Sequence, residues 1–159
     1  MYEALEKVTS SEHHIPADAF LAHFFRMYDD TATISWQVGF CTPSQELIVF
    51  TVTGDAVQVN PPAEAFSDQK EILPFAQQEE VTFNSSDAVD AVISLLRSEH
   101  PGHDANQIIL LAQTLPSFGS IYNVTVVTKT FHLFNVKCSV VDGAVLHKEF
   151  SHIWSLRKD

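Results

Sequence analysis

The stretch FHLFNVKCSVVDGAVLHKEFSHIWSL (residues 131–156) decides the fold expected for this chain, because apolar and polar residues alternate along much of it. Alternation with a period of two is typical of a strand with one buried face. Asp142-Gly143 lies between two such runs, and Asp-Gly is a strong signal for a tight hairpin turn. We therefore predict two antiparallel strands, over residues 131–141 and 144–156.

The sequence before this hairpin predicts two more strands, over residues 107–115 and 120–127, with a turn at residues 116–119. A single strand over residues 121–141 would be about 70 Å long at about 3.3 Å per residue, longer than a domain of this size. A turn is therefore expected near residues 128–130. The C-terminal part of the chain is predicted as a meander of four antiparallel strands.

The N-terminal part predicts helices first. Leu5 and Val8 lie three residues apart among charged neighbours, which predicts a short helix over residues 2–11. A second helix is expected to begin near Pro16 and to end at Asp29-Asp30, where the chain turns into a strand. Three aromatic residues lie four apart and would form one ridge of this helix: Phe20, Phe24 and Tyr28.

Strands over residues 31–41 and 46–53 follow, with a Gly-Asp turn and a short return strand over residues 56–60. Residues 61–84 are acidic and interrupted by prolines, so we expect an irregular insertion there. The next helix is predicted over SSDAVDAVISLLRS (residues 85–98), after which His100-Pro101-Gly102 ends it.

Together these elements predict one α+β domain over residues 1–159, with a strongly bent antiparallel sheet packed on about three helices in a cone-like arrangement. Strands and helices do not alternate, so the pattern does not indicate a parallel nucleotide-binding sheet.

The chain is acidic, with 20 Asp and Glu against 9 Lys and Arg and a formal net charge of −11. Such a surface repels phosphate, so direct binding of nucleic acid is not expected. The longest purely apolar run covers residues 108–112, too short to cross a bilayer, and the first residues do not resemble a signal peptide. We expect a cytoplasmic or nuclear protein that does not bind membranes.

The sequence contains eight histidines and two cysteines, but their spacing does not match a known set of metal ligands, and no cofactor-binding motif is present. We therefore predict neither a metal nor a cofactor. A weaker alternative is an acid–base enzyme in which Asp29, Tyr28 and His132 converge with Trp36 in a cone-shaped cavity. The competing interpretation is that Tyr28 and Trp36 belong to the core.

The last two predicted strands also suggest a binding surface. One face of residues 131–140 is apolar throughout and should lie under the helices, whereas the other is half apolar and half polar. An exposed face of this mixed kind is typical of a partner surface, and a closed, barrel-like sheet is the alternative. The predicted partner-binding residues are Phe131, Leu133, Asn135, Lys137, His147, Glu149 and Ile153.

The order of elements resembles the nuclear transport factor 2-like family, in which a bent antiparallel sheet wraps a cone of helices. AFLAHFFRMYDDTATISW (residues 19–36), the predicted helix at residues 85–98, and residues 131–156 carry the resemblance. The insertion at residues 42–84 and ILLAQTLPSFGSIYNVTVV (residues 109–127) look like the paired domains of mRNA-export receptors, the Tap-type large subunit and its small partner. This resemblance implies a heterodimer formed through the open sheet face, and a pocket for Phe-Gly nucleoporins.

The leading hypothesis is therefore a non-catalytic interaction domain that forms a homo- or heterodimer, with mRNA nuclear export as its role. A small cone-fold isomerase or dehydratase is the second hypothesis. The third is a cystatin-like binding or inhibitor protein with a duplicated helix–sheet unit. It arises because ELIVFTVTGDAVQVN (residues 46–60) and LFNVKCSVVDGAVLH (residues 133–147) each show a strand, a Gly turn and a return strand.

Overall fold

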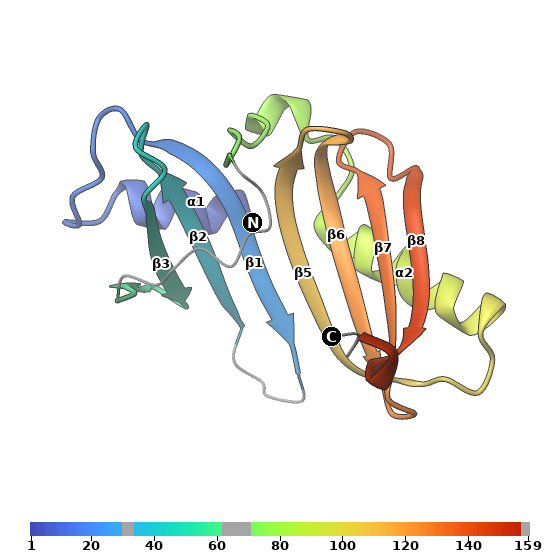
Figure 1. The fold of residues 1–159 in the computed structure, drawn as a ribbon. Coiled ribbons are helices and arrows are strands. Elements are labelled where there is room, and N and C mark those ends of the chain that lie inside the picture. Colours follow the sequence, from blue (N-terminus) through green and yellow to red (C-terminus); the bar gives the residue numbers. More distant parts are fainter. Residues whose placement is uncertain (30–33, 62–70, 157–159) are drawn as a thin grey trace.

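The structure is a computed structural model that describes residues 1–29, 34–61 and 71–156. In these residues eight strands form one antiparallel sheet, and two α-helices cover one of its faces (Figure 1). The helices are α1 (Tyr2–Thr9) and α2 (Ser85–Glu99). The strands are β1 (Phe20–Tyr28), β2 (Ser35–Cys41), β3 (Leu47–Thr53), β4 (Ala56–Val59), β5 (Ala105–Leu115), β6 (Gly119–Thr128), β7 (His132–Ser139) and β8 (Val145–His152).

The fold is a repeat of one helix followed by four strands. The strand order is β4-β3-β2-β1-β5-β6-β7-β8, so the first strand of each unit pairs at the centre and later strands follow outward. Gly54 and Gly143 lie in the matching turns before β4 and β8, both with a positive φ, of 58° and 72°. This arrangement resembles the duplicated unit of the third hypothesis, and the predicted α+β class with an antiparallel sheet is confirmed.

The helix predicted from Pro16 to Asp29 is wrong, because Phe20–Tyr28 is strand β1. Spacings of four residues fit a helix, but four is also a multiple of two, so Phe20, Phe24 and Tyr28 equally share one face of a strand. β1 pairs with both β2 and β5 and is central in the sheet. A central strand carries apolar residues on both faces, which hid the alternation in the sequence.

Losing that helix leaves two α-helices in the described residues instead of about three. The four-strand meander is confirmed as β5 to β8, with the expected turn between β6 and β7. Helix α2 is also confirmed, and its N-cap is Asn84, whose side-chain oxygen accepts a hydrogen bond from the Ser86 amide at 3.2 Å.

The core is the layer between the helices and the sheet. Phe24, Phe50, Tyr122 and Phe134 are its largest fully buried aromatic side chains, and α2 adds an apolar stripe that ends at Leu96. An edge-to-face contact joins the first unit to the connecting segment, because the ring of Phe24 lies 5.8 Å from that of Phe75.

Both cysteines, Cys41 and Cys138, are buried and free. Burial raises the pKa of both thiols, that of Cys138 to about 11. They therefore stay protonated at neutral pH and act as small core side chains.

The predicted irregular insertion at residues 61–84 is described only at residue 61 and from residue 71 onward; residues 62–70 lie outside the described chain. Residues 71–84 contain one short 3₁₀ turn, η1 (Gln78–Glu80). The segment is anchored at both ends: the Phe75 amide donates to the carbonyl of Leu21 at 2.9 Å, and the Phe83 amide to that of Val140 at 2.9 Å.

Candidate functional site

Five of the seven predicted partner-binding residues lie together on the face of the sheet opposite the helices. The alternate residues of β7, namely Phe134, Val136 and Cys138, are buried under the helices, so their neighbours project to the other side. In the ladder, Lys137 is opposite His147 and Asn135 is opposite Glu149. We call the whole face of the sheet opposite the helices the open face. The five predicted residues that lie on it are Leu133, Asn135, Lys137, His147 and Glu149.

Phe131 and Ile153 lie beyond the ends of these strands. Phe131 precedes β7 with a φ of 59°, and Ile153 begins a second 3₁₀ turn, η2 (Ile153–Leu156). The Ile153 amide donates to the Phe131 carbonyl at 2.9 Å. The structure thus places these two residues beside each other, at one end of the open face.

Hydrogen bonds fix the polar side chains of the open face. The side-chain nitrogen of Asn135 donates to the side-chain oxygen of Asn123 at 2.7 Å and to the hydroxyl of Thr125 at 2.9 Å, both on the neighbouring strand β6. The Lys137 ammonium donates to the Asn135 side-chain oxygen at 3.0 Å. This network holds the side chains in place, so the polar half of the face is ordered before any partner binds.

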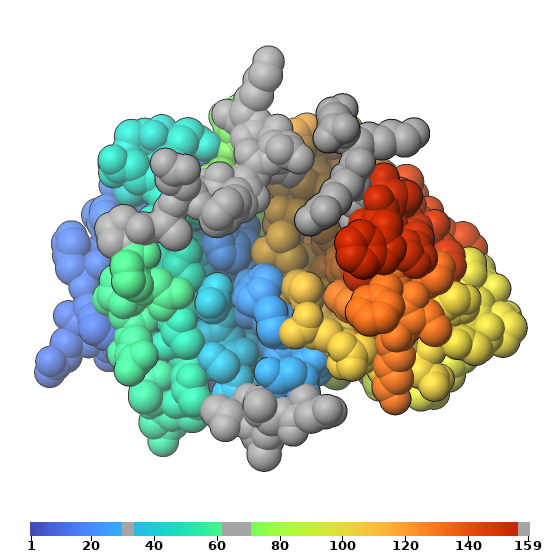
Figure 2. Space-filling view, turned by 60° about the horizontal axis from the view of Figure 1, so that its bottom comes forward, coloured from blue at the N-terminus to red at the C-terminus, as the bar shows by residue number. Residues whose placement is uncertain are grey.

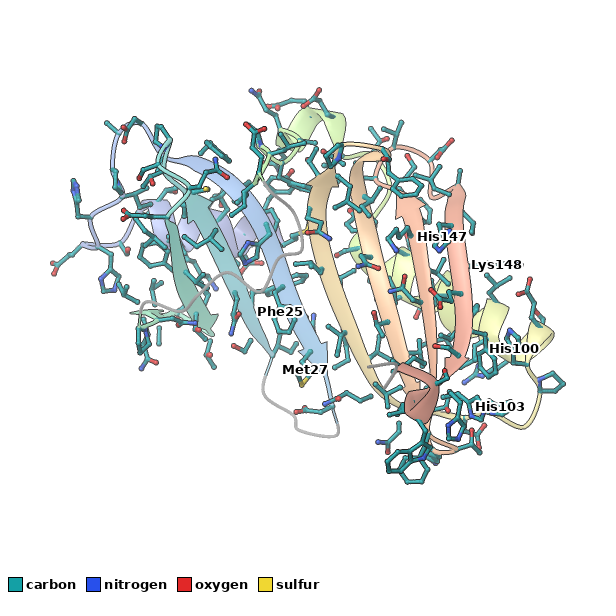
Figure 3. The ribbon with its side chains drawn as sticks, in the orientation of Figure 1. Phe25, Met27, His100, His103, His147 and Lys148 are labelled. Carbon is teal, nitrogen blue, oxygen red and sulfur yellow. The ribbon has the colours of Figure 1, made fainter. Side chains whose placement is uncertain are left out.

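The apolar half of the open face is on the two central strands. Phe25 of β1 is opposite Leu111 of β5, and Met27 is opposite Ile109. Met27 is 43% exposed. This part of the face is not evident in the sequence, because the residues of β1 also fit the periodicity of a helix. Figure 3 shows Phe25 and Met27 on β1 and His147 on β8, viewed from the side opposite the helices.

The sheet has very little charge for so acidic a protein. Its eight strands contain a single acidic residue, Glu149, although the chain has 20. The only charged residues that the strands place on the open face are Glu149 and Lys137. Figure 2, turned so that the bottom of Figure 1 comes forward, shows the blue-to-green surface of the first half beside the gold-to-red surface of the second. Depletion of charge is characteristic of the centre of a protein interface.

The alternative catalytic group is not assembled. Tyr28 ends β1 and His132 begins β7, with β5 and β6 between them, so three strand spacings of about 4.8 Å separate the two strands by about 14 Å. The Tyr28 ring instead contacts the Arg26 guanidinium, 4.1 Å from its centroid. Burial raises the pKa of Tyr28 despite this cation. Asp29 follows the strand and is exposed.

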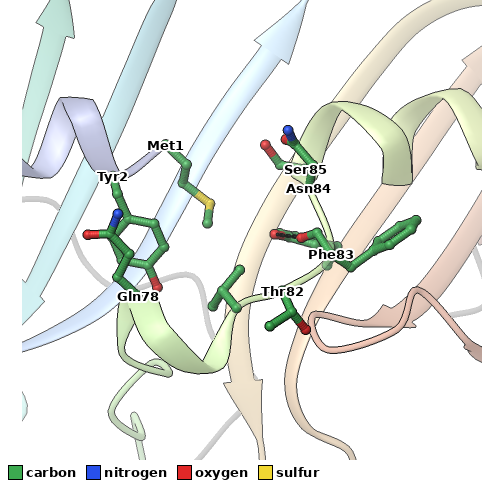
Figure 4. A pocket seen from close by; sticks show the side chains of 9 residues that line it. Met1, Tyr2, Gln78, Thr82, Phe83, Asn84 and Ser85 are labelled. Carbon is green, nitrogen blue, oxygen red and sulfur yellow. Dashed lines mark hydrogen bonds between the residues drawn. The ribbon is translucent and has the colours of Figure 1, made fainter.

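A pocket of about 340 Å³ lies between the beginnings of α1 and α2 (Figure 4). Its lining residues are Met1, Tyr2, Gln78, Val81, Thr82, Phe83, Asn84, Ser85 and Tyr122. Both tyrosine hydroxyls donate to backbone carbonyls, that of Tyr2 to Ala76 at 2.8 Å and that of Tyr122 to Phe83 at 2.7 Å.

These hydroxyl groups are poor acids and bases. Burial, with the carboxylates of Glu79 and Glu80, raises the pKa of Tyr2 to about 12, and burial also raises the pKa of Tyr122. The nine lining residues include no Asp, Glu, His, Cys or Lys. The side chains of the pocket therefore offer hydrogen bonds to a ligand, and none of these side chains exchanges a proton near pH 7. Met1 also lines the pocket, and burial lowers the pKa of its α-amino group from the ordinary value.

Across the described parts of the chain, no three His, Cys, Asp or Glu side chains are placed so that they could hold a metal ion. The same residues include no helix that is long and apolar enough to cross a membrane.

Comparison with known proteins shows the fold alone. No family model matches the chain, and no curated protein matches it. A solved structure of a candidate lipoprotein from Clostridium difficile 630 is similar, with a TM-score of 0.53, 11% sequence identity, and 84% of each chain covered.

Proposed function

We propose that this protein is a non-catalytic interaction domain that binds a protein partner through the open face of its sheet. The observation that carries the proposal is an apolar strip on β1 and β5 that continues into a hydrogen-bonded polar network on β6 and β7, on a face almost without charge. No α-helix of the described residues covers this face, since α1 and α2 both lie on the other side.

The size of the face is suitable for a specific complex. Five neighbouring strands of the sheet form this face: β1, β5, β6, β7 and β8. With about 4.8 Å between strands and about eight residues of about 3.3 Å in each, they give a flat area of about 600 Å². Side-chain relief increases the accessible area, and a standard interface buries about 800 Å² on each partner. The strip of Phe25, Met27 and Ile109 would supply the apolar centre, and the hydrogen-bonded side chains of β7 the polar rim.

A second candidate is a binding or inhibitor protein of cystatin type, which the repeat of one helix and four strands favours. The enzyme alternative has less support, because Tyr28 and His132 are far apart and no side chain that lines the pocket is an acid–base group near pH 7. The role in mRNA export, the Phe-Gly partners, the relation to the nuclear transport factor 2-like family and the cytoplasmic or nuclear location rest on the sequence and stay predictions.

Size-exclusion chromatography with light scattering tests the proposal directly, because it separates a homodimer from a monomer by mass. A monomer is then used as bait, and a captured protein supports the proposal only if Met27→Glu abolishes capture while Val141→Glu does not. Val141 is 59% exposed in the β7–β8 turn and serves as the control. A protein that stays monomeric, and whose captured proteins do not depend on Met27, would contradict the proposal.

A further inference from the structure

Four histidines gather at one end of the second unit. His100 caps the end of α2, His103 follows it in the loop to β5, His132 begins β7, and His152 ends β8. All four rings are near the ring of Phe150 or near each other. Figure 3 labels His100 and His103 at this end of the sheet.

The packing of these rings is close. His100 stacks on Phe150 with 3.8 Å between ring centroids and 8° between planes, and His132 lies parallel to the same ring at 4.9 Å. His132 is also the centre of the imidazole cluster, 4.6 Å from His103 and 4.7 Å from His152. A proton gained by His132 therefore places a positive charge directly beside two more titratable rings.

Hydrogen bonds determine where the protons reside on two of the rings. Nδ1 of His132 is 2.9 Å from the Thr130 carbonyl oxygen, which can only accept, so this nitrogen carries a hydrogen. Nδ1 of His152 accepts from the backbone amide of Trp154 at 3.3 Å, and an amide can only donate. Neutral His152 therefore carries its hydrogen on Nε2, and Nδ1 is the atom that gains a proton in acid.

Protonation of His152 on Nδ1 therefore removes the acceptor of the Trp154 amide hydrogen bond. Nδ1 then becomes a second donor that faces the amide. The 3₁₀ turn η2 begins at this point. Its other described anchors are the Ile153 amide on the Phe131 carbonyl, at 2.9 Å, and the Ser155 hydroxyl on the His152 carbonyl, at 2.7 Å. Trp154 is 64% exposed in the turn.

Among residues 1–29, 34–61 and 71–156, the other charged groups near the cluster are few. On α2 and β8, Glu99 and Lys148 form an ion pair with each other. Asp104 follows His103 in the loop, and Lys129 lies in the turn before β7, with its backbone amide on the Asp104 carbonyl. The two carboxylates and two ammonium groups balance in number, so the imidazoles decide how the local charge changes with pH.

We propose that His103, His132 and His152 form an acid-sensitive latch that holds η2 at neutral pH and releases it, with Trp154, when the cluster gains protons. Histidine is the side chain whose ordinary charge change falls between pH 5 and 8. In the protonated cluster, repulsion between adjacent imidazolium rings adds to the loss of the Trp154 hydrogen bond. This latch does not depend on the proposed partner-binding function.

Tryptophan fluorescence tests the latch in a Trp36→Phe background, where Trp154 is the only tryptophan. Acrylamide quenching is measured from pH 8 to pH 5, with far-UV circular dichroism to confirm that the fold persists. We expect quenching to increase between pH 8 and pH 5, by at most about 1.5-fold because Trp154 is already 64% exposed in the turn. His152→Asn should abolish this transition and keep quenching at its pH 8 value throughout, because the Asn side-chain oxygen replaces Nδ1 as acceptor and cannot be protonated.

The exposed His14, which lies outside the cluster, provides the matched control, and His14→Asn should leave the transition unchanged. A flat pH profile in the background protein, or a transition that persists in His152→Asn, would overturn the latch. Nitrogen NMR of the wild-type imidazoles at pH 8 provides a check without any variant: His152 should be the Nε2–H tautomer, and an Nδ1–H tautomer would equally overturn it.

Discussion

The imidazole of His23 lies directly over Gly39 on the neighbouring strand. The two residues are opposite each other in the β1–β2 ladder, and a β-carbon at Gly39 would be only 2.1 Å from Cε1 of His23. The ring therefore occupies the space that any other residue at position 39 would fill.

We expect Gly39→Ala to destabilise the protein by about 1–3 kcal/mol, the usual range for overpacking a well-filled site. Urea denaturation measures this change. Gln37→Ala, two residues away on the same face of β2, should stay within about 0.5 kcal/mol.

A double-mutant cycle identifies the cause of that loss. Because a serine at position 23 vacates the space over Gly39, Gly39→Ala should cost clearly less in a His23→Ser background than in the wild type. Equal costs in the two backgrounds would show that the His23 ring is not what excludes the methyl group.

The burial of His23 also predicts how stability depends on pH. Burial lowers the pKa of His23 to about 4, whereas an unfolded histidine titrates near about 6.5. The unfolded chain therefore binds this proton more tightly than the folded chain does. The contribution of neutral His23 to the free energy of unfolding is complete above pH 6.5 and is lost as the pH falls toward 4. The loss is about 2–3 kcal/mol by pH 4.5.

Urea denaturation at pH 7.5 and pH 4.5 checks this dependence. His23→Gln should reduce the difference between the two pH values, whereas His13→Gln, at an exposed position, should leave it unchanged. If His23→Gln shows the full wild-type difference, the pH dependence arises from other groups.

Two substitutions on the open face should weaken partner binding without unfolding the domain. Met27→Glu and Leu133→Glu each place a carboxylate in the proposed interface, where an unpaired charge loses its hydration on binding. We expect the dissociation constant of the complex to increase at least tenfold, and the circular dichroism spectrum to stay that of the folded domain. Ile153→Glu, at the end of the face, should have a smaller effect. Unfolding of Leu133→Glu would show that this residue belongs to the core.

Much of the second unit could be predicted from the sequence because its strands alternate in polarity. β7 has one buried face and one mixed face, so Leu133, Asn135 and Lys137 could be placed on the open side without a structure. Strand β1 is central and apolar on both faces, and its four-residue spacings fit a helix equally well. The sequence therefore does not predict the apolar strip at Phe25 and Met27, because it does not predict strand β1.

The histidine cluster could not be predicted because its members are far apart in sequence. His103 and His132 meet only because β5 and β6 form a hairpin that returns the chain to the same end of the sheet. His132 and His152 meet through the register of β7 and β8, which a β-bulge shifts near Cys138. Pairwise distances of this kind depend on register, and a one-residue slip changes the face of every side chain.

The repeat provides an internal comparison between Gly54 and Gly143, which occupy matching turns. Both have a positive φ, so alanine at either position adopts a left-handed conformation that costs about 1–2 kcal/mol. Only Gly143 is crowded: a β-carbon there would be 2.5 Å from the ring of Phe83, whereas nothing lies within 4 Å at Gly54. We expect Gly143→Ala to destabilise the protein by at least about 1 kcal/mol more than Gly54→Ala, because the Phe83 ring must move away from the turn.

Urea denaturation of both variants, repeated with Phe83→Ala, measures the difference. Removing the ring should make the two glycine substitutions equally costly, and a difference that survives Phe83→Ala would contradict this account of how the connecting segment packs against the β7–β8 turn.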